Sequence, residues 1–136
     1  MVASTFFFGL GYPGMMEFER LMDASLADAE GMAKWAERDP VLNIHKVQAP
    51  LKIETYGSRS ALLWWDTYAW MRRLGKPVEY IYYPYGTHNL VKPRERERSM
   101  QGAVDWYRFW LLGEEDDSPS KTEQYRRWRE MKSTEQ

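Results

Sequence analysis

Hydrophobic residues between positions 15 and 37 recur every third or fourth residue, the spacing of one face of an α-helix. This spacing predicts a helix over Met15–Glu37, and Gly31 is a weak point at which it could divide into two shorter helices. Asp39-Pro40 ends the pattern, because the residue before a proline disfavours helical backbone. The apolar stripe consists of Met15, Phe18, Met22, Leu26, Ala29, Ala33 and Ala36.

The middle of the chain predicts a strand, a helix and a second strand. Leu51–Thr55 alternates as a short strand, and a polar stretch over Tyr56–Ser60 separates it from a helix over Leu62–Leu74. Val78–Tyr83 is a β-branched and aromatic run suited to the second strand. Such a unit implies parallel strands joined by a right-handed crossover. The inner face of the helix is predicted to carry Trp64, Tyr68 and Met71.

A long amphipathic helix is predicted over Pro93–Leu112, and Gly113 ends it. Its buried stripe is expected to contain Met100, Ala103, Val104, Tyr107 and Leu111, widened by Trp106 and Trp110. Glu114–Pro119 is an acidic linker, and Tyr125–Met131 is expected to form a frayed helix in a solvated tail. The predicted segments are therefore an apolar N-terminal segment (1–14), an α/β unit (15–112) and a charged C-terminal tail (113–136).

The order of these features resembles the C-terminal part of prolyl oligopeptidase-family serine peptidases, which have the α/β-hydrolase fold. The resemblance runs from about Asp39 to Leu112. It is carried by "LGKPVEYIYYPYGTHNL" and by the following "KPRERERSMQGAVDWYRFWL". It implies an α/β fold in which this chain forms the C-terminal portion of an α/β-hydrolase sheet, with parallel strands and flanking helices.

The same resemblance gives His88 the role of general base in a Ser-Asp-His triad. A histidine can take a proton from a serine hydroxyl because its unperturbed pKa lies near neutrality. The sequence contains no Gly-x-Ser-x-Gly turn that would expose a nucleophilic serine. The family's acid loop follows the strand that corresponds to Leu51–Thr55, yet no Asp or Glu lies between Tyr56 and Trp65. We therefore expect the chain to be inactive on its own.

Composition excludes several other classes of function. A net charge of −1 argues against binding to nucleic acid through phosphate neutralisation. The absence of cysteine excludes disulfides and thiolate metal sites, and two histidines are too few for a convincing zinc site. We expect no metal site, and the resemblance implies no cofactor. The alternating charges of Arg94–Arg98 are expected to form a solvated helix start.

The apolar run Phe6–Phe8 is too short for a membrane span, which needs about 20 apolar residues. No basic region precedes it, so we expect neither a signal peptide nor a membrane anchor, and we expect a soluble protein whose compartment stays open.

Two functions remain. The first is a serine peptidase-type hydrolase that acts on a peptide substrate in the complete family. The alternative is a non-catalytic interaction module or truncated remnant that self-associates or docks on an upstream hydrolase half.

Overall fold

Two parallel strands lie at the centre of the part of the chain that the computed structural model describes, residues 14–133. β1 (Leu51–Tyr56) pairs with β2 (Val78–Tyr83) in a continuous register from Leu51–Val78 to Tyr56–Tyr83. The expected adjacent, parallel strands are confirmed, as is the α/β class with flanking helices. The expected segment 1–14 lies, apart from Gly14, outside the described residues.

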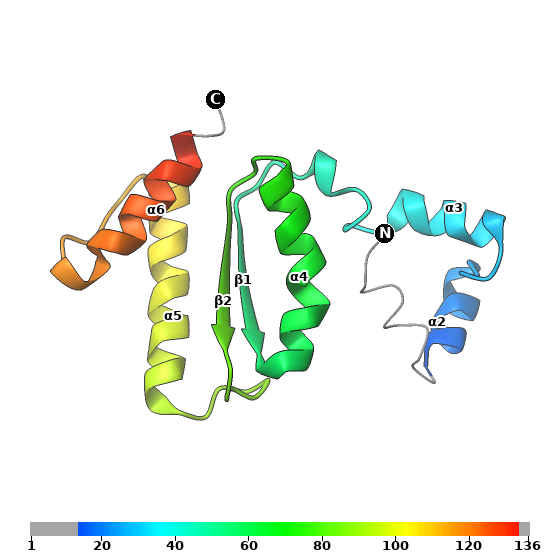
Figure 1. Ribbon diagram of the computed structural model, residues 1–136, viewed down its shortest axis with the longest axis horizontal. Helices are drawn as coiled ribbons and strands as arrows, with labels where there is room; N and C mark the ends of the chain where they lie inside the picture. The colour runs from blue at the N-terminus through cyan, green and yellow to red at the C-terminus, as the bar shows by residue number, and fades with distance from the viewer. Residues whose placement is uncertain (1–13, 134–136) are drawn as a thin grey trace.

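Helices cover both faces of this sheet (Figure 1). α4 (Gly57–Arg73) connects the strands and packs on one face. α5 (Pro93–Tyr107) lies on the other face and continues into a π-helical turn, η2 (Arg108–Leu112). A short 3₁₀ turn, η3 (Pro119–Lys121), then leads into α6 (Thr122–Ser133), which lies beside α5.

Strand alternation divides the side chains of the sheet between these layers. Ile53 and Val78 point towards α4, where they form a buried cluster with Met71 and with Ile44 of η1 (Ile44–Lys46). Tyr80 extends this layer, because its ring packs 5.1 Å from that of Tyr68 and its hydroxyl donates to the Ala61 carbonyl at 2.7 Å. We refer to this group as the α4 core.

A second buried cluster lies between α5, η2 and α6. It contains Trp106, Phe109, Tyr125 and Trp128, and the ring of Trp128 meets that of Trp106 edge-on at 5.2 Å. We refer to this cluster as the α5–α6 core. It contradicts the expected solvated tail, because the aromatic spacing within Thr122–Ser133 is used to dock a well-formed helix.

The predicted helix over Met15–Glu37 is two helices, α2 (Met15–Met22) and α3 (Ala29–Arg38). The break is not at Gly31, as expected, but at Asp23, whose φ of 49° is left-handed. Asp28 then caps α3 by accepting the Gly31 N–H at 2.7 Å. Gly31 serves close packing instead, since a Cβ there would lie 1.9 Å from the Ser25 carbonyl oxygen.

Three further expectations are wrong. The polar loop over Tyr56–Ser60 does not exist, because Gly57 adopts a φ of +67° and turns β1 directly into α4. Trp64 is exposed rather than on the inner face of α4. The expected buried stripe of the long helix, which is α5 and η2 in the structure, is also largely exposed, because Trp106 of α5 and Phe109 of η2 pack against α6. Its exposed members are Met100, Val104, Tyr107 and Leu111.

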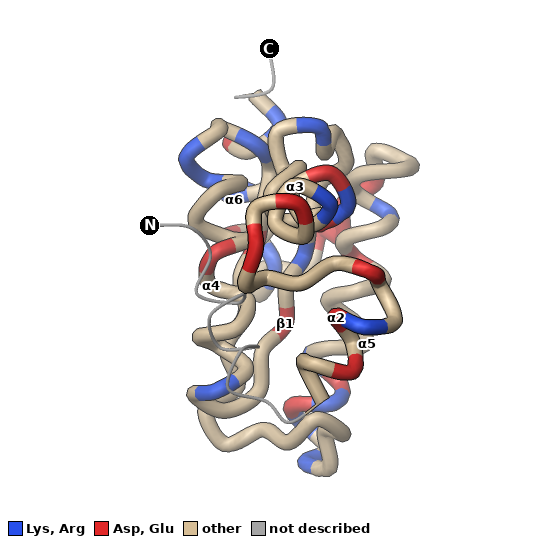
Figure 2. The backbone as a smooth tube through the Cα atoms, turned by 90° about the vertical axis from the view of Figure 1, so that its right-hand side faces the viewer, with Lys and Arg blue, Asp and Glu red and all other residues tan. Residues whose placement is uncertain are grey.

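Acidic and basic residues are interspersed along the backbone rather than gathered on one face of the view in Figure 2. Among the described residues, no helix is both long enough and apolar enough to cross a membrane.

Candidate functional site

His88 lies in the loop that follows β2, as the sequence predicts. The chain turns at once after the strand, because the Gly86 N–H donates to the Tyr83 carbonyl at 3.1 Å. The Thr87 hydroxyl donates to the Asn89 carbonyl at 2.7 Å and so closes a small turn around His88. His88 is exposed, and its side chain makes no hydrogen bond or ion pair within residues 14–133. The imidazole is therefore accessible, but no described residue fixes its tautomer.

The turn from β1 into α4 lies against this loop, because parallel strands bring their carboxyl ends to the same edge of a sheet. A Cβ on Gly86 would lie 3.3 Å from Cδ1 of Tyr56 and 2.9 Å from Cβ of Tyr83. A Cβ on Gly57 would lie 4.0 Å from the Gly86 carbonyl oxygen. The structure thus brings the histidine loop beside the turn from β1 into α4.

The turn from β1 into α4 carries hydroxyl groups rather than a carboxylate. Ser58 and Ser60 occupy the first turn of α4, and no Asp or Glu lies between Tyr56 and Trp65. The carboxylate nearest in sequence belongs to Glu54. It points to the face of the sheet that α5 covers, where it pairs with Lys52 and accepts a hydrogen bond from the Ser99 hydroxyl of α5. Glu54 is therefore already committed to structural contacts.

Two stacked tyrosines lie at the ends of the strands, beside the histidine loop. The rings of Tyr56 and Tyr83 are 5.8 Å apart and nearly parallel. Burial, together with the charge of Glu54, raises the pKa of Tyr83 to about 12, and the same causes raise the pKa of Tyr56. Both phenols stay protonated near neutral pH and cannot act as bases there. Hydrophobic periodicity does not indicate this pair, whereas the register of the two strands places Tyr56 opposite Tyr83.

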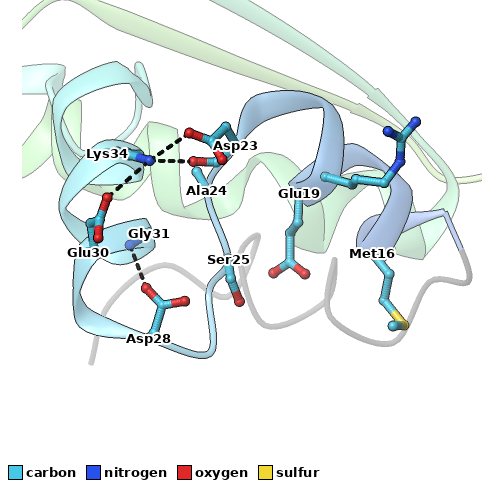
Figure 3. Close-up of a pocket in the computed structure, with 10 residues that line it drawn as sticks. Met16, Glu19, Asp23, Ala24, Ser25, Asp28, Glu30, Gly31 and Lys34 are labelled. Atoms are coloured by element: carbon cyan, nitrogen blue, oxygen red, sulfur yellow. Dashed lines mark hydrogen bonds and ion pairs between the residues drawn. The ribbon is translucent and has the colours of Figure 1, made fainter.

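A separate cavity of about 500 Å³ lies between α2 and α3. Figure 3 shows Lys34 between Asp23 and Glu30, while the Asp28 carboxylate meets the backbone of Gly31. These charges already neutralise one another or cap the helix. No residue predicted as a site lines this cavity, so we do not assign it a role in catalysis.

The described residues contain no group of three or more His, Asp or Glu side chains placed to hold a metal ion. His45, the other histidine of the chain, is exposed in η1. It therefore belongs to a different element from the loop of His88.

A parallel strand–helix–strand unit with helices on both faces defines an α/β protein. The chain is similar to lasso peptide isopeptidase AtxE2 of Asticcacaulis excentricus, with 32% identity over 102 residues. The chain is homologous to part of this prolyl oligopeptidase-family enzyme, which confirms the resemblance seen in the sequence. The match covers 75% of this chain and 14% of AtxE2.

Solved structures of AtxE2 isopeptidase have the same fold in the matched part. A serine-to-alanine variant with Astexin3-dC4 bound gives a TM-score of 0.76, and the apo form gives 0.73. Each comparison has 28% sequence identity and covers 91% of this chain but 19% of the AtxE2 chain. No family model matches the chain.

Proposed function

We propose that this chain is the histidine-bearing part of a serine-hydrolase catalytic domain that acts on peptide or isopeptide bonds. The observation that carries the proposal is the exposed loop of His88 at the carboxyl edge of β2, within a segment homologous to an isopeptidase. His88 is the general base in this proposal. It removes the serine proton during attack on the carbonyl carbon and gives it to the leaving amine, so that an acyl-enzyme forms and is then hydrolysed.

The nucleophilic serine and the acid come from outside this sequence in the proposal. This chain has no Gly-x-Ser-x-Gly turn, and hydroxyl side chains stand where the family carries its carboxylate. Without an acid, the tautomer of His88 is not fixed and the imidazolium is not stabilised, which lowers the rate by a factor of about 10⁴. The isolated chain is therefore inactive.

A fluorophosphonate probe tests this inactivity, because it reacts covalently with activated serines. We expect no labelling of the purified chain. Labelling of any serine, with loss of that labelling in His88→Ala, would mean that the chain carries its own nucleophile.

A chimera tests the role of His88 directly. In it, the matched segment of this chain replaces the corresponding segment of AtxE2, which supplies the rest of the enzyme. We expect slow probe labelling that His88→Gln abolishes and that His45→Gln, the matched control, leaves unchanged. Equal labelling of the chimera and its His88→Gln variant, with both proteins folded, would contradict a catalytic His88.

The second candidate function is docking on another hydrolase half, or self-association. It is favoured by a groove of about 320 Å³ between β1 and α5, which Leu51, Ala103, Trp106 and Tyr107 line, and by an edge of β1 that is unpaired within residues 14–133. Co-expression with AtxE2 that lacks the matched segment tests it. Co-purification without recovery of probe labelling supports docking alone, whereas recovery of labelling supports the catalytic proposal.

A further inference from the structure

The outer edge of β2 is unpaired within the described residues, because the sheet contains only β1 and β2 there. The Leu51 N–H donates to the Pro77 carbonyl, which fixes the direction of every backbone group along β2. In a parallel pair, alternate residues direct both their N–H and C=O groups to the same neighbour. Glu79 and Ile81 therefore face β1, whereas Tyr80 and Tyr82 direct their backbone groups outwards.

A groove of about 640 Å³ runs along this edge and is flanked by three arginines from three different helices. Arg127 of α6 pairs with the nearly buried Glu79 at 3.0 Å. Arg72 of α4 and Arg98 of α5 are exposed and form no ion pair with any described residue. The groove therefore has an excess of positive charge beside unsatisfied backbone donors and acceptors.

The two walls of the groove differ in character. Tyr80 and Tyr82 project towards the α4 side, where Tyr68 adds another ring, so this wall is mainly aromatic, with Arg72 as its one cation among the described residues. Arg98 and Arg127 lie on the α5–α6 side, so that wall is cationic. A strand added to the edge would alternate its side chains between these walls.

We propose that the outer edge of β2 binds an extended acidic peptide, which adds to the sheet as a further strand. Its backbone pairs with Tyr80 and Tyr82, its acidic side chains meet Arg98 and Arg127, and its apolar side chains lie against the tyrosines. A free inorganic anion would bind to one arginine but would leave the outward backbone groups of β2 without hydrogen-bond partners. An extended peptide satisfies both features, which is the recognition mode known as β-augmentation.

The proposal is tested by fluorescence anisotropy with a fluorescein-labelled hexapeptide of alternating Glu and Val, together with the same peptide containing Lys in place of Glu. We expect binding of the acidic peptide, no binding of the basic peptide, and weaker binding as salt is added. Arg98→Gln should weaken binding about tenfold, as expected for loss of one charge-assisted contact. Arg96→Gln is the matched control, because Arg96 is an exposed arginine of the same helix outside the groove.

Hydrogen exchange distinguishes strand addition from simple charge attraction. Saturating acidic peptide should slow exchange of the Tyr80 and Tyr82 amides and leave the Glu79 and Ile81 amides unchanged. Binding without protection of the Tyr80 and Tyr82 amides would overturn the proposal, as would equal losses in Arg96→Gln and Arg98→Gln. Concentration-dependent protection of these amides before peptide is added would assign the edge to a second copy of the chain instead.

Discussion

Asp105 of α5 is only 3% exposed, yet it remains ionised because three side chains donate hydrogen bonds to it. Burial acts to raise its pKa, but the hydrogen bonds from Lys121, Gln101 and Gln124 outweigh this and hold the pKa below the ordinary value of 3.8. A group with a lowered folded-state pKa stabilises the fold above its unfolded pKa. That contribution disappears as the pH falls through the folded pKa.

Asp105→Asn should therefore lower the free energy of unfolding by about 2 kcal/mol at pH 7, because Lys121 loses its buried partner. The difference from wild type should shrink as the pH falls below about 4. Urea titrations followed by tryptophan fluorescence at a series of pH values measure both effects. Asp117→Asn removes an exposed carboxylate from the same region and should change little; a constant difference at all pH values would contradict this account.

Gly31 provides a second test at the residue scale, in which steric overlap rather than charge changes the stability. Gly31→Ala places a methyl group 1.9 Å from the Ser25 carbonyl oxygen, a backbone atom that cannot move alone. We expect a loss of about 1–3 kcal/mol for the α2–α3 pair. Gly14→Ala is the matched control, since a Cβ there meets nothing within 4 Å. Thermal unfolding that is equal for both variants would mean that α2 and α3 do not pack as described.

At the scale of elements, α6 is held to α5 mainly by Trp128, which is fully buried at 0% exposure. Its ring meets Trp106 and Tyr125 edge-on, each at 5.2 Å. Trp128→Ala should lower the stability of the α5–α6 core by about 3–5 kcal/mol and reduce the near-ultraviolet circular dichroism of the packed rings. Tyr85→Ala, at a position that is 80% exposed, should leave the near-ultraviolet signal and stability almost unchanged.

The sequence predicts the central elements well, because Gly75, Pro77, Pro84 and Pro93 end or begin them by their own backbone limits. It also predicts that His88 follows the second strand. It does not predict which face of α5 is buried, since this helix carries apolar residues on two faces. The Trp106 and Phe109 face is chosen by the rings of α6, a long-range contact that periodicity within one helix cannot reveal.

The junction between β1 and α4 shows the same limit at the candidate site. The five residues Tyr56 to Ser60 are one tyrosine, one glycine and three polar residues, which is the composition of a loop. This composition led to the wrong expectation. The left-handed conformation of Gly57 instead makes the turn in one residue. Composition alone does not show whether a glycine adopts that conformation.

For the molecule as a whole, the exposed stripe on α5 leads us to expect association at micromolar concentration. Met100, Val104, Tyr107 and Leu111 are 61%, 49%, 62% and 74% exposed and follow one another at helical spacing. The double substitution Val104→Gln and Leu111→Gln should shift the protein towards monomer and reduce binding of a hydrophobic dye. Light scattering coupled to size exclusion measures the first effect.

The control for this experiment is Arg94→Gln with Arg96→Gln, which changes two exposed residues of the same helix outside the stripe. A sharp peak at the 16.2 kDa chain mass for the wild-type protein, without dye binding, would contradict the expectation. The four exposed apolar side chains would then be part of the surface of a stable monomer.

Two polar contacts join the sheet to α5 and α6. Ser99 of α5 reaches Glu54, Arg127 of α6 reaches Glu79, and neither apolar cluster shares a buried member with the other. Such a division favours separate cooperative units, which open with different free energies. Native-state hydrogen exchange should therefore reveal two groups of slow amides. Replacing both carboxylates, in Glu54→Gln combined with Glu79→Gln, should release α5 and α6 from the sheet while the Trp106–Trp128 packing persists.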